Sequence, residues 1–236
     1  MNGVQISADQ WVIWQSSTWP MVKVNATLAF TWGVMLLLVI GSWLVTRRMT
    51  SDTLIPRWQN LLEVLITGMR DQIRDVSRQE PGAYLPFVGT LFLFIATANL
   101  LSIVPGYVPP TGSLSTTAAL ATCVFFAVPI FGIASQGLAG YLKQYIQPTL
   151  LMLPFNVIGD LSRTLALAVR LYGNMMSGTV IAAILIGFVP LVVPIAMQVL
   201  GLLTGIIQAY IFAVLAMVYI ASASRSTVVP HRDAAS

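Results

Sequence analysis

Three charged side chains interrupt an otherwise apolar stretch of the sequence, residues 154–187. They are Asp160, Arg163 and Arg170, and in a helix they fall on one face. Spacings of three and four residues extend this face to Asn156, Leu167, Asn174 and Ser177. A charge at bilayer depth costs from about 3 kcal/mol on insertion scales to about 10 kcal/mol or more for an isolated helix in simulations. This polar stripe is therefore the first candidate for a functional site.

Arg170 is the charge in the stripe that has no evident partner. Asp160 precedes it by ten residues, about 15 Å along a helix axis, which is too far for a direct ion pair. Arg163, three residues after Asp160, is the natural partner of that acid. An arginine cannot neutralise itself by losing a proton at ordinary pH. We therefore expect the carboxylate that faces Arg170 to come from another subunit; the alternative is an arginine bonded to backbone carbonyls in a structural role.

The composition places the chain in a membrane and excludes most enzyme classes. Of its 236 residues, 57% are hydrophobic and only 8% are charged, whereas soluble domains are about a quarter charged. The net charge of +4 rests on few residues, most of them in loops, so we do not expect nucleic acid as a partner. The chain has one cysteine, Cys123, and one histidine, His231. We expect no metal site, no cofactor and no catalytic site.

Five segments are long and apolar enough to cross a bilayer. They cover residues 25–46, 84–104, 116–142, 154–187 and 191–224. The last two would each be about 51 Å long as straight helices, well beyond a hydrocarbon core of about 30 Å. The predicted fold is therefore an all-α polytopic membrane protein in a single membrane domain, with a helical hairpin over 84–142 and a pair of long, strongly tilted helices over 154–224.

The distribution of charged residues predicts the topology. Arg47 and Arg48 end the first span, which places residues 1–24 outside and this end of the span in the cytoplasm. Lys143 follows the third span, the basic tail begins at Arg225, and the external loop over 105–115 has no charge. The first apolar run follows a single Lys23 and is too long for the core of a signal peptide, so we do not expect it to be cleaved.

Residues 56–80 are predicted to form an amphipathic helix. Its apolar side consists of Trp58, Leu61, Leu62, Leu65, Met69, Ile73 and Val76. Its charged side consists of Arg57, Glu63, Arg70, Asp71, Arg74, Asp75 and Arg78. The segment is too charged to cross a membrane, so we expect it to lie along the cytoplasmic surface. A soluble helix packed on a partner is the alternative.

Polar and helix-breaking residues mark the remaining spans. Asn99, within 84–104, is expected to form a hydrogen bond between helices. Pro129 and Gly132 predict a kink in the third span. In the last span, one face carries Gln198, Gly201, Gly205 and Gln208, with Thr204 beside it. The two glycines predict close helix packing, and Gln208 is the expected polar partner of the stripe that contains Arg170.

Two motifs give the chain a specific resemblance. Residues 170–175, RLYGNM, resemble the RLFGNM signature of subunit a of F-type ATP synthases. Residues 208–215, QAYIFAVL, resemble the QAFIFxxL segment of the same family. Residues 154–163 are similar to the entry of that family's long helix, and NLLSIVPG with residues 116–121 is similar to its middle hairpin. The resemblance covers residues 25–224.

The resemblance implies a stator subunit that provides two half-channels for ions against a rotating ring of c subunits. Arg170 would face the essential carboxylate of the ring, keep it ionised and prevent direct leakage between the half-channels. Asn174 and Gln208 would orient this arginine and line the paths. The implied location is a bacterial inner membrane, with b-type peripheral stalk subunits as further partners and the sites for ATP on other subunits.

Two departures from the family pattern leave the coupling ion open. Many proton-translocating members have a glutamate where this chain has Thr179, and many bacterial members have a histidine or acid where it has Gly201. Residues that could hold water or a hydrated cation remain on this side: Ser177, Thr179, Gln198 and Thr204. They cannot relay protons by titration. The proton is the family default, and sodium is the alternative.

Other roles remain open from the residues alone. Asp160 matches a carboxylate of the family's inner access path, but it could also seat the helix through a salt bridge to Arg163. A stand-alone ion channel or secondary transporter is the alternative function. It would need its own counter-charge for Arg170 and usually paired repeats, neither of which is evident in the sequence.

Overall fold

A computed structural model describes residues 12–15, 23–47, 63–64, 67–68, 70–71, 74–75, 84–104, 106–146, 152–187 and 192–224 of the protein. Within these ranges, five helices are long and apolar enough to cross a membrane. They are α1 (Ala26–Arg47), α3 (Leu85–Leu100), α4 (Leu114–Ile146), α5 (Met152–Ile186) and α6 (Val192–Ser224). The predicted class, an all-α polytopic membrane protein, is confirmed.

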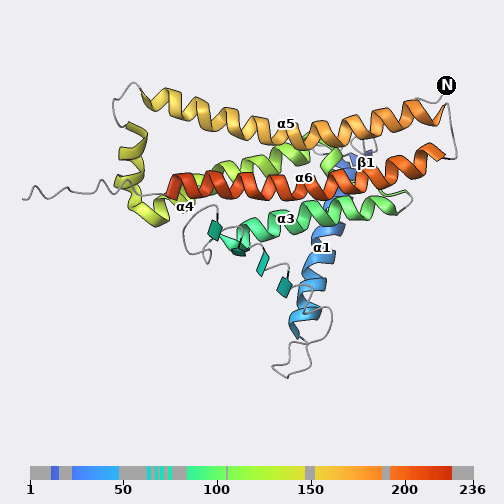
Figure 1. The fold of residues 1–236 in the computed structure, drawn as a ribbon, viewed down its shortest axis with the longest axis horizontal. Coiled ribbons are helices and arrows are strands. Elements are labelled where there is room, and N and C mark those ends of the chain that lie inside the picture. The colour runs from blue at the N-terminus through green and yellow to red at the C-terminus, as the bar shows by residue number, and fades with distance from the viewer. Residues whose placement is uncertain are drawn as a thin grey trace, which may run out of the picture.

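The long helices run side by side, and the first one crosses them. In Figure 1, α3, α5 and α6 follow the long axis of the molecule, and α1 runs across it. α5 and α6 run in opposite directions and pack on each other, as the short connection between them predicts. α6 also packs on α3 and on α4, so it contacts each of the helices α3, α4 and α5. The long pair is thus inclined steeply to α1.

Two short strands are an addition that the sequence did not predict. β1 (Val12–Gln15) and β2 (Lys23–Asn25) pair antiparallel, with Trp14 opposite Val24. β2 leads directly into α1. The expected external segment, residues 1–24, therefore contains part of a small hairpin; the rest of that segment lies outside the described residues.

The predicted amphipathic helix over 56–80 lies largely outside the described residues. The positions that the structure describes there are helical and exposed: Glu63, Val64, Thr67, Gly68, Arg70, Asp71, Arg74 and Asp75. They include most of the predicted charged side, whereas the predicted apolar side lies outside the description. Placement on the membrane surface therefore stays a prediction.

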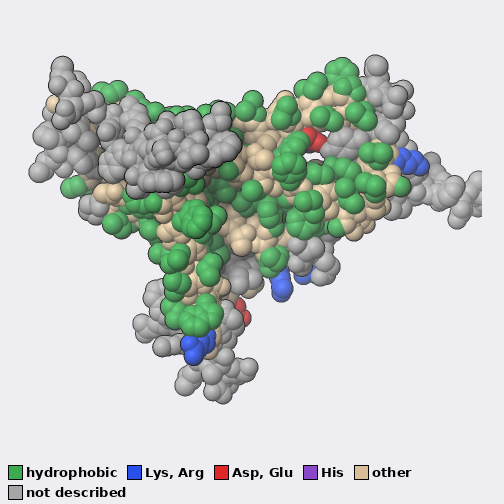
Figure 2. Space-filling view, turned by 180° about the vertical axis from the view of Figure 1, so that it is seen from behind, with side chains coloured by type: hydrophobic (Ala, Val, Ile, Leu, Met, Phe, Trp, Pro, Cys, Tyr) green, Lys and Arg blue, Asp and Glu red, His purple; other side chains and the backbone are tan. Residues whose placement is uncertain are grey.

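The interior is formed where α6 meets α3, α4 and α5. Its central cluster includes Ile95 of α3, Leu167 and Leu171 of α5, and Phe212 and Ala216 of α6. On the outside, large apolar side chains stay exposed along the helices, and Figure 2 shows hydrophobic side chains spread along the described part of the face it draws. In water such a surface would associate or aggregate, so it fits a chain that is covered by lipid.

Asn99 connects three elements in this interior. Its side chain is 1% exposed, and its Nδ2 donates to the Gly205 carbonyl of α6 at 2.9 Å. The Thr111 hydroxyl, in the short helix η3 (Pro110–Gly112), donates to Asn99 Oδ1 at 2.7 Å. The predicted hydrogen bond between helices is therefore confirmed. A Cβ at Gly205 would lie 2.8 Å from Asn99 Cβ, so this glycine allows the close approach.

α4 has a break in its backbone that the sequence did not predict. Pro129 and Gly132 were the expected kink, but the non-helical backbone angles fall at Gly137, with φ 75° and ψ 162°. Only glycine adopts this region readily. Gly132 has a different use, because a Cβ there would lie 2.7 Å from the ring of Tyr141. The sequence of this span does not single out Gly137, because close packing and backbone reversal both favour glycine; a kink at Pro129 and Gly132 stays a prediction.

Gly205 and Gly201 offer a matched test of this packing. Gly205→Ala should destabilise the chain by about 1–3 kcal/mol, because the new methyl group overlaps Asn99. Gly201→Ala should be neutral or stabilising, because a Cβ there meets nothing within 4 Å and alanine favours the helix by up to about 1 kcal/mol. Melting temperatures of the purified variants in detergent measure both effects. Equal losses would contradict the assignment of Gly205 as the site of close approach.

Candidate functional site

Two contacts fix how the polar stripe of α5 faces α6. Asn174 Nδ2 donates to Gln208 Oε1 at 2.5 Å, and the Arg163 guanidinium lies 5.8 Å from the centre of the Tyr219 ring. Eleven positions separate the two contacts on each helix. Because eleven residues are close to three helical turns, the same faces of α5 and α6 meet at both contacts. Gln208 is confirmed as a partner of the stripe, through Asn174.

Arg170 lies on the stripe between these two contacts. It is exposed. Across the described part of the chain, the ion pair that forms is between Arg163 and Asp160, and none forms with Arg170. The described residues therefore agree with the expectation that this chain does not supply a counter-charge for Arg170.

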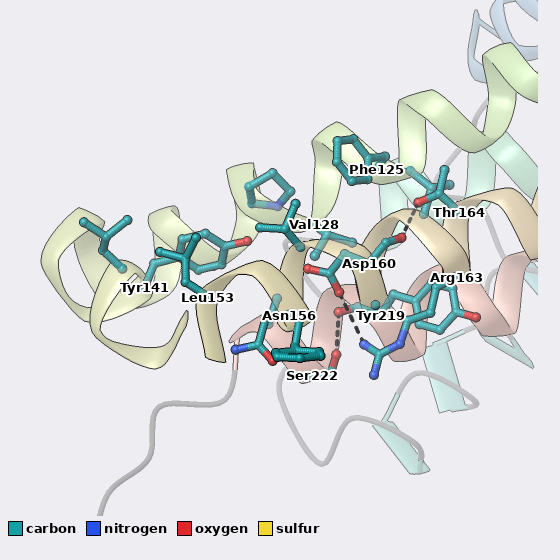
Figure 3. Close-up of a pocket in the computed structure, with 17 residues that line it drawn as sticks. Phe125, Val128, Tyr141, Leu153, Asn156, Asp160, Arg163, Thr164, Tyr219 and Ser222 are labelled. Carbon is teal, nitrogen blue, oxygen red and sulfur yellow. Dashed lines mark hydrogen bonds and ion pairs between the residues drawn. The ribbon is translucent and has the colours of Figure 1, made fainter. Parts of the chain in front are cut away.

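The Asp160 end of the stripe opens into a cavity. The Arg163–Asp160 pair, at 3.4 Å, lies on the wall of a space of about 690 Å³ between α4, α5 and α6. Asn156 and Thr164 of α5 also line it (Figure 3). The predicted pairing of Arg163 with Asp160 is confirmed. The pair is not sealed inside the chain, because the two side chains are 57% and 25% exposed.

The other walls of the cavity come from residues that were not predicted from the sequence. Tyr219 and Ser222 of α6 face the ion pair, and Phe125, Val128 and Tyr141 of α4 line the opposite side. The residues of α6 could have been found, since steps of three and four from Gln208 lead to Tyr219 and Ser222. Those of α4 carry no such signal, because only the fold places them here.

Three hydroxyl groups mark the other end of the stripe. Ser177 donates to the Gly173 carbonyl at 2.5 Å, and Thr179 donates to the Met176 carbonyl at 2.9 Å. Thr204 of α6 donates to the Leu200 carbonyl. All three are exposed. Each hydroxyl group donates its proton to a carbonyl of its own helix. In this arrangement, the oxygen lone pairs are what the three groups offer to a water molecule or a cation.

Gln198 and the two glycines of the same face of α6 have different surroundings. Gln198 Nε2 donates to the Ser102 carbonyl at 2.5 Å, in the short helix η2 (Leu101–Ile103), and so ties α6 to the end of α3. Gly201 is exposed and makes no close approach to the described residues. Gly205 does, but to α3 rather than α5. Close packing is therefore observed at Gly205, whereas at Gly201, which α6 presents to the surface, it stays a prediction.

Comparison with known proteins gives a consistent result. The family model described as ATP synthase A chain matches residues 28–221. The chain is 61% identical to ATP synthase subunit a 2 of Acaryochloris marina, over 94% of each chain. It is 60% identical to ATP synthase subunit a 1 of Chlorobaculum parvum, over 94% of this chain and 97% of that one. It is 58% identical to ATP synthase subunit a of Albidiferax ferrireducens, over 94% and 95%.

The exposure of the Arg163–Asp160 pair predicts how little it stabilises the fold. Asp160→Asn should change the free energy of unfolding by less than about 1 kcal/mol, because an ion pair in contact with water is screened. Arg163→Gln should give a similarly small change. Thermal unfolding in detergent measures both. A loss of several kcal/mol in either variant would show that the pair seats the helix and would favour the structural role.

Proposed function

This chain belongs to the ATP synthase A chain family, and on that premise we propose how its residues carry ions. It is the membrane stator subunit of a rotary F-type ATP synthase and takes part in the ion flow that is coupled to ATP synthesis or hydrolysis. It has no catalytic site for ATP of its own. Family membership sets aside the alternative of a stand-alone channel or secondary transporter.

We propose that Arg170 faces the carboxylate of a c subunit across the exposed surface of α5 and α6. The observation that carries this proposal is an exposed arginine without a carboxylate partner among the described residues. Around it, apolar side chains such as Val169, Ile207 and Tyr210 are also exposed. A carboxylate about 4 Å from Arg170 would be attracted by about 4 kcal/mol at an effective dielectric constant of about 20. That attraction keeps each passing carboxylate ionised, so that it releases its ion.

The inner half-channel is assigned to the cavity between α4, α5 and α6. Its single acid, Asp160, offers a hydrated carboxylate to an approaching cation, and Arg163 beside it limits how strongly a cation is held. Asn156, Thr164 and Ser222 supply further polar atoms along its wall. In this assignment Asp160 is a residue of the ion path rather than only a structural partner of Arg163.

The outer half-channel is assigned to the far end of the stripe, beyond the Asn174–Gln208 contact. That contact keeps α5 and α6 together on the outer side of Arg170. Ser177, Thr179 and Thr204 line the exposed surface beyond it. We place Gln198 at the edge of this path. Its Nε2 donates to the Ser102 carbonyl, so its Oε1 is the side-chain atom that remains for water or an ion. Arg170 then separates two paths that do not connect directly.

The energy for rotation comes from the membrane potential. Each elementary charge that passes down both half-channels gains about 2.3 kcal/mol per 100 mV. The stator can use this energy only if ions cannot bypass the ring. A fixed positive charge between the half-channels opposes such a bypass, and Arg170 is the residue placed to do so.

The proposal includes the orientation and the remaining partners. Arg47 at the end of α1 and Lys143 near the end of α4 support an inner location for these helix ends, with the N-terminus outside and the C-terminus in the cytoplasm. The segment over 106–113, without charge, supports an outer location. Stalk subunits of the b type are retained as partners on the basis of the family resemblance, in a bacterial inner membrane.

Sodium is kept as a second candidate for the coupling ion because of the hydroxyl groups. Residues 171–224 contain no Asp, Glu, His, Lys or Arg. The protons of Ser177, Thr179 and Thr204 are engaged with their own helices, which leaves lone pairs that can meet a cation but no free donor to pass on a proton. A proton must therefore use water along this path, whereas a hydrated sodium ion would find oxygen ligands.

Arg170→Ala should abolish coupled transport while leaving the fold intact. The exposed side chain contributes little to packing, so the complex should assemble, but ATP-driven ion pumping in inverted vesicles should fall to background. Arg47→Ala, at the end of α1 and away from the stripe, is the control and should pump at the wild-type rate. Normal coupled pumping by Arg170→Ala would reject the proposed site.

The sodium dependence of the purified complex distinguishes the two coupling ions. With the proton, ATP hydrolysis and pumping should be unchanged from sodium-depleted to sodium-rich buffer, and the vesicle interior should acidify. With sodium, hydrolysis should rise with sodium concentration, and a protonophore should not stop sodium uptake. The first result would reject sodium, and the second would reject the proton.

A further inference from the structure

α4 changes direction near its end, next to the cavity proposed as the inner half-channel. Gly137 interrupts the helix with φ 75° and ψ 162°, a region that is essentially restricted to glycine. Residues 138–146 continue as helix in a new direction, and we call them the hook. The Tyr141 ring, in the hook, returns over Gly132, where a Cβ would lie 2.7 Å from it.

The residues just before the reversal contact the end of α6. Gln136 Nε2 donates to the Ala223 carbonyl at 2.9 Å, and the Ser135 hydroxyl lies 3.5 Å from the Ser224 carbonyl. A helix leaves its last four carbonyls without partners of its own, and Ala223 and Ser224 are the last residues of α6. Side chains of α4 therefore cap α6.

This cap and the inner cavity share their walls. Tyr141 and Leu142 of the hook line the cavity, and so does Ala223, the residue whose carbonyl Gln136 holds. Within the preceding turn of α6, Tyr219 and Ser222 face the Asp160–Arg163 pair (Figure 3). The position of the end of α6 therefore decides how far Tyr219 and Ser222 stand from that pair.

We propose that Gln136 and Gly137 are positioning residues of the inner ion path: they hold the end of α6 against α4 and thereby keep the cavity open beside Asp160. This inference rests on the proposed function of that cavity. Neither residue touches the ion. Gln136 acts through a donated hydrogen bond, and Gly137 acts by allowing the hook to turn back and form a wall.

The chemistry of the cap gives opposite expectations for two charged variants. Gln136→Glu keeps almost the same shape but replaces the donor by an anion, which the carbonyls at the end of a helix repel. Gln136→Lys changes the shape but keeps a donor, and a cation at this end of a helix is favourable. If Gln136 acted through packing alone, the glutamate variant would keep more ion flow than the lysine variant. If Gln136 acts as a donor at the end of α6, the lysine variant keeps more.

Two readouts test the proposal in the assembled complex. The first is the rate of ion flow through the membrane sector of inverted vesicles after removal of the catalytic sector. The second is the rate at which a membrane-impermeant maleimide labels Ser222→Cys, in a chain where Cys123→Ser removes the natural thiol. The control is Leu138→Ala, because Leu138 lies in the hook and is 65% exposed.

The expected result is that Gln136→Glu lowers ion flow by about tenfold and changes the labelling rate, whereas Gln136→Lys and Leu138→Ala match the wild type in both readouts. If Gln136→Glu does not accumulate, Gln136→Met, which is similar in length and has no donor, takes its place with the same expectation. Equal losses in the lysine and glutamate variants, or wild-type behaviour in the variants without a donor, would overturn the positioning role.

Asp160→Asn separates failure of this inference from failure of the proposed function. If Asp160→Asn lowers ion flow but Gln136→Glu leaves flow and labelling unchanged, the cavity carries ions and the cap does not position it. If Asp160→Asn leaves ion flow unchanged and the cysteine at position 222 is not labelled from water, the cavity is not an ion path. That result would reject the proposed function of the cavity and, with it, the positioning role of Gln136 and Gly137.

Discussion

A positive charge in an apolar helix, without a carboxylate partner among the described residues, is the constraint on which the rest of this protein depends. Arginine keeps its proton at every ordinary pH, and Arg170 lies in a helix that is otherwise apolar. Among the described residues, the acid of the same stripe, Asp160, is paired with Arg163. Such a charge is tolerable in a membrane only beside water or beside a carboxylate from a partner. The exposed position of Arg170 leaves both possible.

The scaffold holds that charge by fixing α6 on several sides. Asn99 binds α6 at Gly205, Asn174 binds it at Gln208, and Gln136 binds it at Ala223. Two of these three contacts use a backbone carbonyl of α6 as the acceptor. Lipid does not drive apolar helices together as water does, so close packing and hydrogen bonds must provide much of the specificity. The three contacts come from different helices, so α6 cannot easily slide or turn without breaking one of them.

Polar residues in the membrane therefore serve two purposes in this chain, and the fold separates them. Asn99 is fully packed and satisfied by Gly205 and Thr111, which makes it part of the scaffold. Ser177, Thr179 and Thr204 are bonded within their own helices and remain exposed. The first kind sets distances between helices. In the proposed function, the second kind lines a surface along which an ion or water passes, at little cost to the fold.

The sequence by itself determined the five spans, the two long helices, the stripe with Arg170, the Asp160–Arg163 pair and the hydrogen bond of Asn99. These follow from local rules, because apolar length, helical spacing and the cost of an unpaired polar group can all be counted along one chain. Tertiary structure alone decided that α4 breaks at Gly137, that Gly205 packs on α3 while Gly201 does not, and that Gln198 binds Ser102. It also brought residues of α4 to the cavity of Asp160. The physical reason is that each glycine or glutamine has several possible uses, and the neighbour that decides between them comes from a distant part of the chain.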